Sequence, residues 1–110
     1  MDAAEVAPPD PRWKAATSPR ALTVDDDPGF LLGLAELVRR EGFAVASAGS
    51  LKQAREEIAA NPPDILLVDL RLPDGSGLDL LGSFEPAEAP EFLLITGDAT
   101  VDTAVDALRR

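Results

Sequence analysis

Three short apolar runs constrain the fold of this 110-residue chain more than any other feature. They lie at 21–24, 65–68 and 92–95, and the second and third are continuously apolar, which is typical of strands covered on both faces. The segments between the runs carry helical periodicity. Strands that alternate with helices predict an α/β domain, in which right-handed crossovers build one parallel sheet with helices on both faces.

The segments between the runs also carry helix start and stop signals. The first helix is expected to begin after Asp27 as N-cap with Pro28 in its first turn, and to end at Gly42. Ser50 followed by Gln53 is a capping-box signature for a second helix. The apolar faces of these helices are predicted to be Phe30, Leu34, Leu37 and Val38, and Leu51, Ala54 and Ile58.

Further elements complete the expected domain. A short strand is predicted over 43–46, a turn at 73–75, a short helix holding the leucines of 78–81, and a last helix carrying 101–108. Residues 1–20 contain four prolines and no periodicity, which predicts a flexible leader before a domain over 21–110.

Polar residues follow each of the three apolar runs directly. Asp25 and Asp26 follow the first, Asp69 the second and Thr96 the third. Function in parallel α/β sheets lies beyond the carboxyl ends of the strands, where these residues are expected to meet. Because clustered carboxylates repel one another, they require a cation or shifted pKa values. The chain has no cysteine or histidine, so a divalent metal with oxygen ligands is the predicted occupant.

Charge and hydropathy exclude several classes of function. The net charge is −10, and residues 1–20 sum to zero, so 21–110 carry the whole excess. Direct binding of nucleic acid is not expected, because phosphate contacts require clustered lysine and arginine. No apolar stretch approaches the length that spans a bilayer, and the N-terminus does not resemble a secretory signal. A cytoplasmic location with no membrane partner is the expectation.

The residues from 21 to 110 resemble the receiver domain of two-component response regulators. The resemblance rests on VDDDP at 24–28, LVDLRLPDGSG at 67–77 and LITG at 94–97, in this order and spacing. It implies a flavodoxin-like parallel sheet of strand order 2-1-3-4. It also implies a signalling module, not an enzyme, of the kind found in transcriptional regulators.

The resemblance assigns roles to individual residues. Asp69 is implied as the phosphoryl acceptor, and Asp25 and Asp26 as the acidic pair that holds Mg²⁺ together with Asp69. The backbone carbonyl of Arg71 is implied as a further metal ligand and Thr96 as the switch hydroxyl. Whether Asp25 binds the metal directly or supports Asp26 stays open. The implied partners are a sensor histidine kinase and an effector absent from this chain.

The sequence also departs from the receiver pattern. Receivers continue into a fifth strand, a Lys-Pro pair and a fifth helix, which this chain lacks, so no counterpart of the family lysine is expected. A domain truncated in this way exposes the strand over 92–95 as a sheet edge. Self-association through that edge, partial unfolding, or both are therefore predicted.

Two other functions remain open at this point. One is a degenerate receiver that serves only as a protein-interaction module. The other is a Mg²⁺-dependent phosphohydrolase with an aspartyl nucleophile. Hydrolases of the haloacid dehalogenase type require an acid two residues after the nucleophile, and that position here is Arg71.

Overall fold

A four-stranded parallel sheet forms the centre of the protein, whose computed structural model describes residues 18–95. Its strands and the two α-helices are β1 (Arg20–Val24), α1 (Pro28–Arg40), β2 (Ala44–Ala48), α2 (Leu51–Ala60), β3 (Ile65–Asp69) and β6 (Glu91–Ile95). The strand order is β2-β1-β3-β6. Because β6 is the fourth strand of this sheet along the chain, the predicted order 2-1-3-4 is confirmed.

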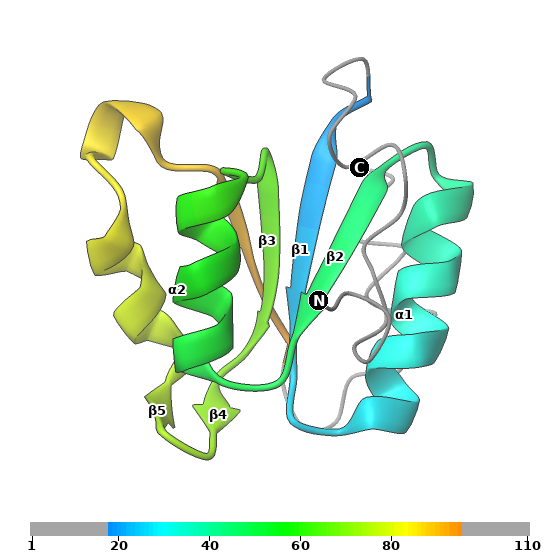
Figure 1. The fold of residues 1–110 in the computed structure, drawn as a ribbon, viewed down its shortest axis with the longest axis horizontal. Helices are drawn as coiled ribbons and strands as arrows, with labels where there is room; N and C mark the ends of the chain where they lie inside the picture. Colours follow the sequence, from blue (N-terminus) through cyan, green and yellow to red (C-terminus); the bar gives the residue numbers. More distant parts are fainter. Residues whose placement is uncertain (1–17, 96–110) are drawn as a thin grey trace.

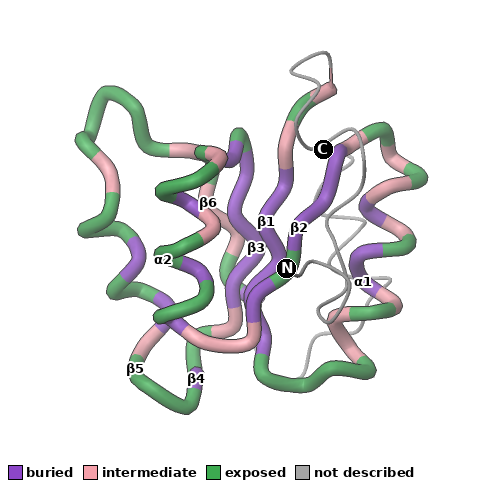
Figure 2. The backbone as a smooth tube through the Cα atoms, in the orientation of Figure 1, coloured by how far each residue is buried: buried purple, intermediate pink, exposed green. Residues whose placement is uncertain are grey.

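The two α-helices lie on opposite faces of the sheet (Figure 1). The strands between them are the most continuously buried part of the backbone, as Figure 2 shows. Side chains that alternate along each strand therefore feed two separate apolar clusters. The cluster beneath α1 includes Ala21, Leu34, Ala35, Val38, Val45, Ile65, Leu67 and Ile95, and the cluster beneath α2 includes Leu22, Val24, Leu51, Ala54, Ile58, Leu66, Val68, Leu72 and Leu80.

The helix boundaries follow the predicted signals. The side chain of Asp27 accepts hydrogen bonds from the amides of Gly29 and Phe30, and α1 starts at Pro28. After α1, Gly42 takes a φ of 101°, a conformation that glycine adopts without steric cost. The N-cap of α1 and its glycine stop are thus confirmed.

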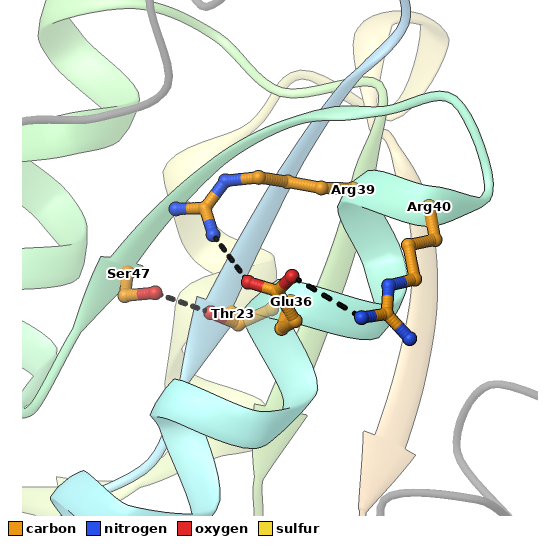
Figure 3. Close-up of polar contacts among 5 residues, drawn as sticks. All are labelled: Thr23, Glu36, Arg39, Arg40 and Ser47. Atoms are coloured by element: carbon orange, nitrogen blue, oxygen red, sulfur yellow. Dashed lines mark hydrogen bonds and ion pairs between the residues drawn. The ribbon is translucent and has the colours of Figure 1, made fainter.

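Polar groups link strands and stabilise helix α1 at two places (Figure 3). Thr23 is fully buried in β1, and its hydroxyl lies 2.8 Å from that of Ser47 in β2. Ser47 is the register partner of Thr23, and β2 continues to Ala48, beyond the apolar stretch that predicted a strand over 43–46. On the surface of α1, Glu36 forms ion pairs with Arg39 and Arg40, each of which contributes about 0.3–0.5 kcal/mol.

The segment after β3 differs most from prediction. The predicted turn at 73–75 joins a small antiparallel hairpin, β4 (Arg71–Leu72) and β5 (Gly75–Ser76), that no sequence pattern indicated. The short helix that follows is a 3₁₀ helix, η2 (Gly77–Ser83), and a second 3₁₀ turn, η3 (Pro86–Glu88), lies in the predicted loop. Of the three leucines in η2 only Leu80 is buried, because three residues per turn do not produce the broad apolar face of an α-helix.

Three expected features lie wholly or mostly outside the described residues. These are the predicted leader, of which only 18–20 are described, Thr96, and the predicted last helix, which carries 101–108. Within 18–95 no helix is long and apolar enough to cross a membrane.

Candidate functional site

The register of the sheet brings the predicted acidic residues together. Val24 in β1 pairs with Val68 in the neighbouring β3, and both strands run in the same direction. Asp25 directly follows Val24, and Asp69 directly follows Val68, so both aspartates lie at the same edge of the sheet. One carboxylate oxygen from each of Asp25, Asp26 and Asp69 lies within 4.8 Å of the others. We call these three residues the acidic triad.

Asp25 is the buried member of the triad, with 7% of its surface exposed. Its backbone amide donates to the carbonyl of Ala48, which extends the β1–β2 ladder by one residue. One carboxylate oxygen accepts a hydrogen bond of 2.9 Å from the amide of Asp27. Burial raises the pKa of Asp25; the amide of Asp27 lowers it, but the charges of Asp69 and Asp26 raise it further.

Asp69 is half-buried at the carboxyl end of β3, opposite Ile95 of β6. Its Oδ1 accepts a hydrogen bond of 3.1 Å from the amide of Arg71. Among the residues that the structure describes, none donates a hydrogen bond to its Oδ2. One oxygen is thus oriented by the backbone, and the other is available for chemistry.

Gly77 packs directly against the backbone of Asp69. Its amide donates to the carbonyl of Leu70 at 2.8 Å, which closes the hairpin β4–β5 onto the end of β3. A Cβ atom at Gly77 would lie 2.2 Å from the carbonyl oxygen of Asp69 and 2.8 Å from Cγ2 of Val68. No side chain fits there without displacing the backbone that carries Asp69.

The acidic triad fits a hard divalent cation. Its potential ligands are all carboxylate oxygens, one buried, one half-buried and one exposed, and they carry uncompensated charge at short range. Mg²⁺ binds through one or two carboxylates and keeps several waters, which suits a site that is open on one side. The observation that most favours a cation is the burial of the Asp25 carboxylate beside two further carboxylates.

The structure brings together three of the predicted site residues, Asp25, Asp26 and Asp69. Arg71, whose carbonyl is the predicted fourth ligand, lies at the start of β4 and bonds Asp69 through its amide. Thr96 follows Ile95 directly and lies outside the described residues. The sequence reading missed the contacts of Asp74, which it took as a turn residue: its carboxylate binds the first two amides of α2.

Neutralising Asp25 is expected to stabilise the metal-free protein. Asp25→Asn keeps an acceptor for the amide of Asp27 but removes one charge from the triad, so at pH 7 the free energy of unfolding should rise by about 1 kcal/mol. The folded wild type holds its Asp25 proton at higher pH than the unfolded chain does. Its stability therefore falls as pH rises from the ordinary aspartate range through the raised pKa, and the advantage of the variant should shrink at low pH.

Chemical denaturation in EDTA at several pH values measures this difference. Mg²⁺ should stabilise the wild type more than Asp25→Asn, because the ion compensates the same repulsion. A variant less stable than wild type at neutral pH without metal would contradict the charge argument.

Comparison with known proteins agrees with this geometry. The chain is 40% identical to the response regulator protein PilR of Pseudomonas aeruginosa over 91 residues. This alignment covers 82% of this chain and 20% of PilR. It is 36% identical over 92 residues to the alginate biosynthesis transcriptional regulatory protein AlgB of the same species, again 82% of this chain and 20% of AlgB. The chain spans only 20% of the length of each of these two relatives.

A solved structure supports the same relationship. A response regulator protein from Burkholderia pseudomallei superimposes with a TM-score of 0.64 at 33% identity, over 83% of this chain and 54% of that one. That protein contains a phosphorylated aspartic acid and a calcium ion. The model of the response regulator receiver domain matches residues 21–110. The chain therefore belongs to the response regulator receiver domain family, whose members are signalling modules of two-component systems and not enzymes.

Proposed function

We propose that this receiver domain accepts a phosphoryl group on Asp69, with Mg²⁺ held by the acidic triad and the backbone carbonyl of Arg71. The observation that carries the proposal is the convergence of three carboxylates within 4.8 Å, two directly after β1 and one at the end of β3. Asp69 belongs to that cluster, and one of its carboxylate oxygens is oriented by the amide of Arg71. Asp26, the exposed member, is positioned as a ligand, and Asp25 binds the ion directly or through a water.

The chemistry follows from the positions of these groups. An oxygen of Asp69 attacks phosphorus, the new O–P bond forms, and the bond from phosphorus to the donor's leaving group breaks. Mg²⁺ held by the acidic triad would neutralise part of the charge on the phosphoryl oxygens. The amide of Arg71 orients the carboxylate of Asp69 before attack. Thr96, placed by sequence directly after β6, is the proposed hydroxyl that binds a phosphoryl oxygen once it is transferred.

The family and its relatives indicate the partners. Receiver domains in general take their phosphoryl group from a cognate histidine kinase. AlgB is named as a transcriptional regulator and PilR as a response regulator, which supports a role for this receiver in control of transcription. The proposed output is an effector in the same pathway. Self-association through β6, at the edge of the described sheet with Leu94 42% exposed, stays a prediction.

A degenerate receiver that binds partners without phosphorylation is the competing function. Intact mass spectrometry after incubation with acetyl phosphate separates the two. We expect the addition of one phosphoryl group, dependent on Mg²⁺, abolished by EDTA and removed by hydroxylamine, which cleaves acyl phosphates. An unchanged mass in Mg²⁺ would contradict the proposal and favour the interaction module. Sustained release of phosphate at substrate excess would instead contradict the assignment as a signalling module.

A further inference from the structure

Asp74 connects the segment after the acceptor to a helix on the face of the sheet. Its Oδ1 accepts a hydrogen bond of 2.8 Å from the amide of Leu51, and its Oδ2 one of 3.0 Å from the amide of Lys52. These are the first two residues of α2, more than twenty positions earlier in the chain. The hydrogen bond from the amide of Leu51 is the main cause that lowers the pKa of Asp74, because it stabilises the charged carboxylate.

This contact completes the N-terminus of α2. The first amides of a helix have no partner within the helix and need outside acceptors. The side-chain hydroxyl of Ser50 accepts a hydrogen bond of 3.2 Å from the amide of Gln53. The backbone carbonyl of Ser50 accepts one of 3.0 Å from the amide of Ala54. The two remaining amides of the first turn, those of Leu51 and Lys52, donate to the carboxylate of Asp74. The negative carboxylate also lies at the positive end of the helix dipole.

The same contact fixes the hairpin β4–β5. Each strand of this hairpin has two residues, too few for an isolated hairpin to be stable in water. Asp74 lies at its tip, between the strand that begins with Arg71 and the strand that begins with Gly75. Gly75 has a φ of 148° and approaches the side chain of Leu51 so closely that a Cβ atom would lie 2.7 Å from its Cδ1. The tip of the hairpin is therefore held against the first turn of α2.

We infer that Asp74 is a positioning residue for the metal site, because it anchors to α2 the hairpin that carries the Arg71 carbonyl. This inference rests on the proposed function and extends it to a residue outside the acidic triad. The amide of Arg71 donates a hydrogen bond to the carboxylate of Asp69. Arg71 also pairs with Ser76 in the hairpin that Asp74 anchors. Loss of the anchor leaves the triad in place but frees the fourth ligand.

The choice of metal distinguishes this role from a general effect on stability. Mg²⁺ requires near-ideal octahedral geometry, whereas Ca²⁺ accepts a flexible and variable oxygen shell. Asp74→Ala should therefore weaken Mg²⁺ binding about tenfold, as loss of groups that orient metal ligands does, and weaken Ca²⁺ binding less. Asp74→Asn keeps one acceptor oxygen and should lie between wild type and Asp74→Ala.

Isothermal titration with Mg²⁺ alone and with Ca²⁺ alone tests this expectation. Glu56→Ala is the matched control, because it removes one negative charge from an exposed position on the same helix. The Mg²⁺ concentration that gives half-maximal phosphorylation should rise about tenfold in Asp74→Ala, while the rate at saturating Mg²⁺ stays near that of wild type. Equal loss of Mg²⁺ and Ca²⁺ affinity, or a wild-type Mg²⁺ affinity in Asp74→Ala, would overturn the inference.

A second measurement uses the wild type and does not depend on the folding of a variant. Coupling between two sites is reciprocal, so Mg²⁺ bound at the triad should slow hydrogen exchange at the amides of Leu51 and Lys52. Exchange at these amides that is unchanged by Mg²⁺, in a protein that binds the ion, would also overturn the inference. If the wild type binds no Mg²⁺ at all, the proposed function fails first, and the two failures are thereby distinguished.

Discussion

Asp69→Asn is expected to abolish phosphorylation by acetyl phosphate, with no phosphoryl adduct in the intact mass where the wild type gains one. The amide that replaces the carboxylate is a poor nucleophile and removes a charged ligand from the acidic triad. Asparagine retains an oxygen for the hydrogen bond from the amide of Arg71, so the fold should persist. Because one charge leaves a repulsive cluster, stability without metal should not fall.

Asp79→Asn is the matched control for this prediction. Asp79 is an exposed aspartate in η2, ten positions further along the chain, and the substitution makes the same change of charge and shape. The control should be phosphorylated at the wild-type rate. An adduct that persists in Asp69→Asn would place the acceptor elsewhere and contradict the assignment.

Gly77→Ala is expected to have the largest effect on stability. The added methyl group would lie 2.2 Å from the carbonyl oxygen of Asp69, and that neighbour is backbone, which cannot turn away as a flexible side chain could. Overpacking of this kind costs about 1–3 kcal/mol, and we expect a value near the upper end. Because the displaced residue is the proposed acceptor, the rate of phosphorylation should fall as well, even where the variant is fully folded.

Gly82→Ala provides the control within the same 3₁₀ helix. A Cβ atom at Gly82 has no heavy atom within 4 Å, so alanine there should change stability by no more than about 0.5 kcal/mol. Urea denaturation followed by circular dichroism measures both variants. Equal stability of Gly77→Ala and Gly82→Ala would show that the close approach at Gly77 does not constrain the fold.

The main sheet was predictable because its signals are local and strong. The apolar runs and the capping residues Asp27 and Ser50 determine elements whose burial and order follow general rules of α/β proteins. The convergence of Asp25 and Asp69 was predictable for the same reason, since parallel strands deliver their carboxyl ends to one edge. Here the structure adds the register, the burial of Asp25 and the spacing of the oxygens.

The segment after β3 was less predictable, because long-range contacts decide its conformation. The turn chemistry at 73–75 is local, but a hairpin with two residues per strand forms only because its tip binds α2. The partner amides of Asp74 belong to a helix more than twenty residues away, and no local pattern encodes that contact. The need for glycine at position 77 likewise arises from the backbone of Asp69, which becomes its neighbour only in the folded chain.

The central claim is that carboxylates from two strands meet around one divalent ion beside the acceptor. A crystal structure grown with Mn²⁺ tests it most directly, because Mn²⁺ prefers the same oxygen ligands as Mg²⁺ and is located by its anomalous scattering. We predict one ion with oxygens of Asp26 and Asp69 and the carbonyl of Arg71 at about 2.0–2.3 Å, and the same map decides whether Asp25 binds directly or through a water. An acidic triad without an ion at saturating Mn²⁺ would contradict the account.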